Sequence, residues 1–100
     1  MTDLERASFF IKAMNVKKCR IIWDVPHALK RLVERNVPQF EAERIIRRAP
    51  GVVKVEVTPE GMERWRVSGF DSDERPIEVV VQTAHNNSAL RVITVIRTDE

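Results

Sequence analysis

Hydrophobic and polar positions follow a helical period in the first half of the chain and a two-residue period after Gly51. In the first half, apolar residues recur every three or four positions, which predicts amphipathic helices. In the second half, apolar and polar residues alternate, which predicts strands with one covered face. Helices followed by strands are typical of an α+β domain.

Three helices are predicted in the first half, over residues 3–15, 26–36 and 39–49. A short strand is expected at the end of residues 16–23, where apolar residues cluster. Pro26 suits a first helical turn, because no hydrogen bond needs its missing amide there. In the helix that follows, Leu29, Leu32 and Val33 are expected to face the core.

Four strands are predicted in the second half, at residues 53–58, 62–70, 77–83 and 90–97. Turn signals rich in proline, glycine and polar residues separate them. Strict alternation places Val53, Val55 and Val57 on one face of the first strand. Trp65 on the second strand is expected to point toward the helices.

The last strand is nearly continuous in apolar residues, which predicts a central position with both faces buried. Alternation along it places Arg91 and Arg97 on the face of Ile93 and Val95. The predicted architecture is α+β, with N-terminal helices packed on one face of a four-stranded, mainly antiparallel sheet. Residues 1–100 are expected to form a single domain.

Composition narrows the class of protein. With 43% hydrophobic and 32% charged residues in 100, the chain is expected to fold. No apolar stretch is long enough to cross a bilayer, and the N-terminus lacks secretory signal features, so no membrane partner is expected. Cys19 is the only cysteine, which excludes an intramolecular disulfide and fits the cytoplasm.

Charge indicates an anionic partner. The net charge of +2 and the pI near 9.0 are too mild to imply nucleic acid by themselves. Arginine supplies 12 of the 17 cations, however. The planar arginine fork suits phosphate or carboxylate better than lysine does.

The most informative motif is His27, Arg31 and Arg35, one residue every four positions. A helix turns such residues by about 40° per step, so they form a ladder along one side. An imidazole that titrates near neutral pH, beside two permanent cations, suits binding and polarising a phosphate. The alternative is a solvated basic helix face.

A family resemblance starts from this ladder and from four further segments, at residues 41–46, 65–69, 76–81 and 91–96. The chain resembles a family of small bacterial proteins catalogued as domain of unknown function forty-two fifty-eight. The resemblance covers residues 20–98 and leaves residues 1–15 as an N-terminal helical extension.

That family is similar to the RelE/ParE and BrnT toxins and to barnase-like ribonucleases. The resemblance implies a RelE/barnase-like fold, a toxin that binds or cleaves RNA without a metal, and an antitoxin protein as partner. The chain departs from the pattern in one respect. It contains no tyrosine, although some toxins of this superfamily use one near the scissile phosphate.

Metal-independent RNA cleavage needs a proton acceptor, a proton donor and cations at the phosphate. His27 is the candidate acid or base, with Arg31 and Arg35 at the phosphate. The candidate RNA-binding residues are Arg64, Arg66, His85 and Arg91. The alternatives are a solvated loop for His85 and an ordinary polar sheet face for Arg64 and Arg66.

No metal or cofactor is expected, because two histidines and one cysteine make a poor zinc site and no glycine-rich phosphate loop occurs. Two other functions stay open. A non-catalytic interaction module would use the ladder to bind an acidic protein partner. In a structural role, His27 would tie the helix to the sheet, and the ladder arginines would pair with Glu56, Glu78 or neighbouring acids.

Overall fold

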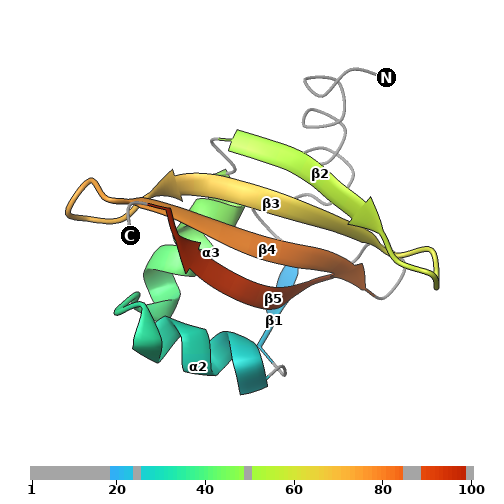
Figure 1. The fold of residues 1–100 in the computed structure, drawn as a ribbon, viewed down its shortest axis with the longest axis horizontal. Coiled ribbons are helices and arrows are strands. Elements are labelled where there is room, and N and C mark those ends of the chain that lie inside the picture. The colour runs from blue at the N-terminus through green and yellow to red at the C-terminus, as the bar shows by residue number, and fades with distance from the viewer. Residues whose placement is uncertain (1–18, 24–25, 49–50, 85–88, 99–100) are drawn as a thin grey trace.

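The fold is that of a computed structural model, which describes residues 19–23, 26–48, 51–84 and 89–98. Two helices, α2 (Pro26–Glu34) and α3 (Gln39–Arg48), lie in these residues. The strands are β1 (Arg20–Ile22), β2 (Gly51–Val57), β3 (Glu63–Phe70), β4 (Pro76–Ala84) and β5 (Ala89–Arg97). Figure 1 shows both helices on the same side of the sheet, as predicted.

The described strands form one five-stranded sheet in the order β1-β5-β4-β3-β2. Strands β2 to β5 make the predicted antiparallel meander, and β1 adds a parallel strand beside the start of β5. The α+β class is therefore confirmed, and β1 confirms the short strand expected near residues 16–23. The prediction of a four-stranded sheet is wrong, because β1 joins the sheet in the described residues. Residues 20–22 are too few to show a two-residue period, and only the return of β5 supplies their partner.

Helix α2 begins at Pro26, as predicted, and ends in a Schellman turn. Asn36 has a φ of 54°, a left-handed conformation that asparagine tolerates better than most residues. Its amide donates to the carbonyl of Val33 at 3.2 Å, and the amide of Val37 donates to the carbonyl of Leu32 at 2.9 Å. These bonds satisfy two carbonyls of the last turn and redirect the chain toward α3.

The core face of α2 differs from the prediction. Ala28 and Leu32 are buried against the core, whereas Leu29 is 41% and Val33 is 83% exposed. Four apolar residues span too wide an arc of a helix for one neighbouring strand, β5, to cover them all. Expecting Leu29 and Val33 in the core was therefore wrong.

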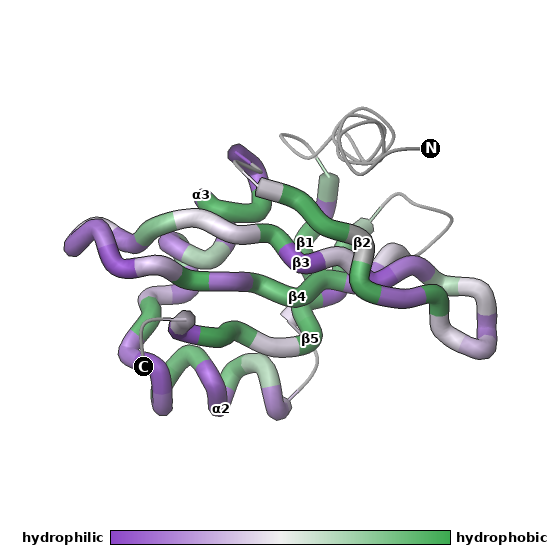
Figure 2. The backbone as a smooth tube through the Cα atoms, turned by 45° about the horizontal axis from the view of Figure 1, so that its top comes forward, coloured by the Kyte–Doolittle hydropathy of each residue, from purple (hydrophilic) through white to green (hydrophobic). Residues whose placement is uncertain are grey.

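Helix α3 packs under β3 and β4 and completes the core. Its buried aliphatic face holds Ala42, Ile45 and Ile46. Trp65 on β3 is 2% exposed and belongs to the same core, so its predicted orientation is confirmed. Figure 2 shows apolar and polar positions alternating along α2, as expected of a helix with one covered side.

Two register irregularities change which residues share a face. In β2, Val55 is the extra residue between Lys54 and Glu56, so Val53 and Val57 lie on opposite faces. In β5, Ile93 is the extra residue opposite the step from Val80 to Val81. The single face predicted for Val53, Val55 and Val57 was therefore wrong, because a bulge breaks the alternation that the prediction assumed.

The irregularity at Ile93 also separates two arginines. Arg97 lies opposite Ile77 on the helix-facing side, whereas Arg91 lies opposite Gln82 on the other face. The prediction that Arg91 and Arg97 share a face was wrong for the same reason.

Several predictions concern residues outside the described ranges. They are the helix at residues 3–15, the loop with His85, and the single-domain extent of residues 1–100. Neither described helix is long and apolar enough to cross a membrane.

Candidate functional site

The first two side chains of the ladder meet on an exposed side of α2. Arg31 Nε donates to His27 Nε2 at 3.4 Å, and His27 is exposed. An imidazole nitrogen has one lone pair, and in this contact the lone pair of Nε2 accepts the bond from Arg31. Nε2 can therefore take up a proton only when Arg31 turns away from it.

Glu34 is an acidic side chain that contacts the His27–Arg31 pair. Arg31 Nη1 pairs with Glu34, which also lies 3.8 Å from the ammonium of Lys30. The Lys30 side chain is 74% exposed, and those of Arg31 and Glu34 are 35% and 37% exposed, so water screens both ion pairs and they contribute little to stability. A phosphodiester carries one negative charge, as a carboxylate does, and can compete with Glu34 for the guanidinium of Arg31.

Arg35 continues the ladder toward the body of the protein and is half-buried. Its carbonyl accepts a hydrogen bond from Arg97 Nε at 2.6 Å, and the carbonyl of Asn36 accepts one from Arg97 Nη2 at 3.1 Å. Arg97 therefore binds the end of α2 and fixes the backbone that carries the last residue of the ladder.

Arg97 is itself held by a buried carboxylate. Its Nη1 lies 2.8 Å from Asp71 Oδ2, and each of these two side chains is 4% exposed. Asp71 Oδ1 accepts backbone bonds from Asp73 and Arg75 at 2.9 Å each, which closes the turn between β3 and β4. One buried ion pair thus joins α2, this turn and the end of β5.

The charge of Asp71 makes stability depend on pH. The amide of Arg75, and then the guanidinium of Arg97, hold the pKa of the Asp71 carboxyl below its ordinary value. Because this pKa is lower in the folded chain, the ionised carboxylate stabilises the fold above about pH 4, and the contribution is lost as the pH falls. We expect Asp71→Asn to melt at a lower temperature than wild type at pH 7, with a difference that shrinks toward about pH 3. Circular dichroism melts across this range measure it.

Asp73→Asn is the matched control, because Asp73 is an exposed carboxylate in the same turn. It should leave the dependence of the melting temperature on pH unchanged. If the difference in melting temperature between wild type and Asp71→Asn is the same at every pH, the role given to the Asp71 charge is wrong.

The sheet arginines lie away from the ladder. Trp65 points toward the helices, so its strand neighbours Arg64 and Arg66 point to the opposite face. Arg91 shares that opposite face, because Gln82 lies between it and Arg64 in the register. These three candidate RNA-binding residues therefore lie on the face of the sheet opposite the helices and do not form one surface with His27 and Arg31.

Cross-strand contacts hold Arg64 and Arg66. Arg64 Nε donates to Gln82 Oε1 at 2.9 Å, and its Nη1 lies 3.1 Å from Glu56 Oε1. Arg66 Nε lies 3.1 Å from Glu78 Oε2. The structural alternative is therefore wrong for Glu56 and Glu78, which pair with sheet arginines, whereas its pairing with a neighbouring acid is met by Arg31 and Glu34.

Cys19 is the only cysteine and is buried. Burial raises the pKa of the Cys19 thiol. The positive charge of Arg47 lowers this pKa, but by less than burial raises it. A buried, neutral thiol is a poor nucleophile. In the described part of the chain, no group of three or more His, Cys, Asp and Glu side chains is placed to hold a metal ion.

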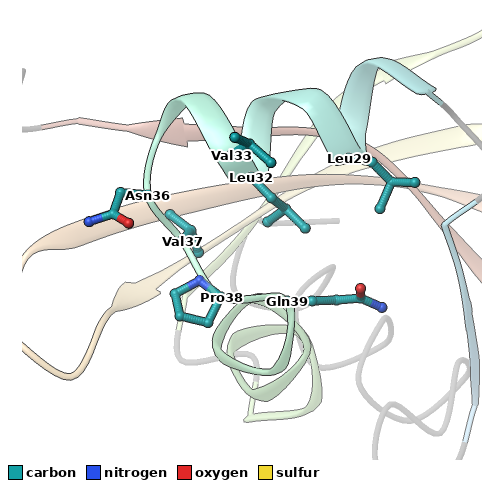
Figure 3. Close-up of a pocket in the computed structure, with 7 residues that line it drawn as sticks. All are labelled: Leu29, Leu32, Val33, Asn36, Val37, Pro38 and Gln39. Carbon is teal, nitrogen blue, oxygen red and sulfur yellow. The ribbon is translucent and has the colours of Figure 1, made fainter.

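An apolar hollow of about 480 Å³ lies beside α2. Its lining residues are Leu29, Leu32, Val33, Asn36, Val37, Pro38 and Gln39. Figure 3 shows them around the end of α2 and the start of α3. We call this hollow the α2–α3 groove. The groove was not predicted from the sequence, because Leu29 and Val33 were expected in the core, although four apolar residues on a nine-residue helix indicated a second apolar surface.

The ladder and the groove occupy different sides of α2. His27 and Arg31 lie about half a turn around the helix axis from Leu29 and Val33. A ligand of one surface therefore need not contact the other.

Comparison with known protein families matches residues 26–97 to the family described as domain of unknown function, DUF4258. No curated protein matches the chain significantly. The match begins at Pro26, runs through the ladder and both helices, and ends at Arg97. The chain belongs to the DUF4258 family.

Proposed function

We propose that the protein binds RNA through the His27–Arg31 side of α2 and cleaves it there without a metal, as a toxin of a toxin–antitoxin system. The observation that carries the proposal is the 3.4 Å contact from Arg31 Nε to His27 Nε2 on an exposed helix surface. It places a proton acceptor beside a permanent cation, with Arg35 further along the helix. The resemblance to RelE/ParE and BrnT toxins that the sequence suggests points to the same function.

The proposed reaction uses His27 as the base. Arg31 turns from His27 Nε2 to the bound phosphate, the ribose 2′-hydroxyl gives its proton to the freed Nε2, and the 2′-oxygen forms a bond with the neighbouring phosphorus. The bond from phosphorus to the 5′-oxygen breaks, and this oxygen takes a proton from water. Arg31 stabilises the negative charge that grows on the phosphate oxygens. The products carry a 2′,3′-cyclic phosphate and a 5′-hydroxyl.

Binding is tested by removing the cation next to the imidazole. We expect Arg31→Ala to weaken binding of a fluorescent single-stranded RNA about tenfold, because a charge-assisted contact to phosphate is lost. The slope of the logarithm of the binding constant against that of the salt concentration should become shallower by about 0.7. Fluorescence anisotropy at several salt concentrations measures both quantities.

Lys30→Ala is the matched control. Lys30 is the preceding residue on α2 and carries the same charge, but its side chain is 74% exposed on another side of the helix. We expect its RNA affinity to stay close to that of wild type. Equal losses in the two variants would show that general charge, and not the His27–Arg31 pair, accounts for binding.

A further inference from the structure

The guanidinium of Arg31 is held at two of its nitrogens in the free protein. Its Nε donates to His27 Nε2 at 3.4 Å, and its Nη1 pairs with Glu34 Oε2. The first contact occupies the lone pair through which His27 accepts a proton, and the second partly neutralises the cation that binds phosphate. The side chains at positions 27, 31 and 34 therefore form one chain of contacts on the same side of α2, which we call the closed arrangement.

Stability does not account for a carboxylate at position 34. Glu34 is the last residue of α2, where the partial negative charge of the helix end disfavours an acidic side chain. Its second cation, Lys30, lies 3.8 Å away in the weaker order, with the lysine before the glutamate. Water screens both ion pairs, so they add little to the free energy of unfolding. The contacts of Glu34 therefore matter more for what Arg31 can bind than for the fold.

Glu34 occupies donors of Arg31 that a phosphate can use. A carboxylate and a phosphodiester each carry one negative charge and offer oxygens to the same guanidinium nitrogens. The guanidinium is planar and rigid, with its donors fixed in one fork. A turn that brings Nη1 from Glu34 to a phosphate therefore moves Nε as well, away from His27 Nε2.

We propose that Glu34 is a built-in competitor of the RNA phosphate and keeps His27 and Arg31 in the closed arrangement until RNA binds. The phosphate takes the place of Glu34 on Arg31, Arg31 turns, and the lone pair of His27 Nε2 becomes free for the 2′-hydroxyl proton. Glu34 is thus a positioning residue that acts through Arg31, and it limits proton transfer to sites where a phosphate is bound. This inference rests on the proposed function and adds the regulation of the same site.

Chemical modification tests the closed arrangement without RNA. Diethyl pyrocarbonate acylates an imidazole nitrogen through its free lone pair, so the bond from Arg31 should slow the reaction at His27. At about pH 8, where imidazoles are neutral, we expect Glu34→Gln and Arg31→Ala to react at His27 about threefold faster than wild type. Mass spectrometry of the peptides from the full chain measures this rate separately from that of His85.

RNA binding tests the competition. Glu34→Gln should bind single-stranded RNA about threefold more tightly than wild type, because the phosphate no longer has to displace a carboxylate from Arg31. Glu60→Gln is the matched control, because Glu60 is an exposed glutamate between β2 and β3 and its loss changes the net charge equally. This control should keep the wild-type affinity and the wild-type reactivity of His27. In the Arg31→Ala background, Glu34→Gln should change the affinity no more than Glu60→Gln does.

Two results would overturn the inference. One is a wild-type rate of His27 modification in Glu34→Gln, which would show that Glu34 does not hold Arg31 against the imidazole. The other is an equal gain in RNA affinity in Glu34→Gln and Glu60→Gln, which would show that net charge alone is responsible. If neither wild type nor Glu34→Gln binds RNA, the proposed function and the competition with phosphate are both wrong, and the modification rates still decide whether Glu34 keeps the arrangement closed.

Discussion

His27→Ala should cleave RNA about 100-fold or more slowly than wild type while binding it with nearly the same affinity. His27 is the proposed acceptor of the 2′-hydroxyl proton, because the Glu34 carboxylate beside Arg31 is engaged by the guanidinium, and Arg31 and Arg35 remain protonated. Loss of the imidazole thus removes the base and leaves the phosphate contacts. Single-turnover cleavage of end-labelled RNA in the presence of EDTA gives the rate, and anisotropy gives the affinity.

The His27→Gln variant tests whether His27 acts as a base or only accepts a hydrogen bond from Arg31. A glutamine oxygen can still accept the hydrogen bond of Arg31 but cannot act as a base near neutral pH. It should therefore bind RNA as wild type does and cleave as slowly as His27→Ala. If glutamine supports wild-type cleavage, His27 orients Arg31 and is not the base. If purified wild type leaves RNA intact, the catalytic part of the proposal is wrong, and the Arg31→Ala result then decides RNA binding by itself.

The same variants can be compared in cells. Induced wild type should arrest growth and cause RNA decay, and His27→Ala should do neither at equal protein level. An acidic partner protein bound through the ladder without catalysis would instead tolerate His27→Ala, because Arg31 and Arg35 would still supply the charge. Growth, RNA integrity and co-purification after expression distinguish these alternatives.

Arg97→Ala should lower the melting temperature by about 10 °C or more. The substitution leaves the buried carboxylate of Asp71 without its guanidinium partner and removes the donors to the carbonyls of Arg35 and Asn36. An ionised group left alone in the interior is strongly destabilising, because it has lost both water and its partner. Thermal melts followed by circular dichroism measure the effect.

Thr98→Ala is the control for this position, since Thr98 is the exposed neighbour of Arg97 and should melt close to wild type. A double-mutant cycle then tests the pair itself. Asp71→Asn combined with Arg97→Met should cost less stability than the sum of the two single changes, because no unpaired buried charge remains. Strict additivity would show that the two side chains do not depend on each other.

The pattern within each segment was sufficient to predict the helices and strands, but not which residues lie on each face of the sheet. The start of α2 at Pro26, the antiparallel meander and the inward position of Trp65 were all predicted correctly. These features depend on spacing within one segment. The bulges at Val55 and Ile93 were not predictable in the same way, because they arise from the register between two strands.

The residue spacing also predicted only part of the candidate site. Four-residue spacing was enough to place His27 next to Arg31, because an α-helix brings such residues onto one side. Spacing could not show that Arg64, Arg66 and Arg91 face the other side of the sheet from α2. It also could not show that β5 covers Ala28 and Leu32 but leaves Leu29 and Val33 exposed.

By itself, the sequence determined the helices, the antiparallel strands and the His27–Arg31 pair, because each follows from contacts between residues close along the chain. Only the tertiary structure decided the partner of β1, the burial of Arg97 against Asp71, and the α2–α3 groove. These features join segments far apart in sequence. Their geometry depends on how helices and strands pack together, which periodicity within one segment does not specify.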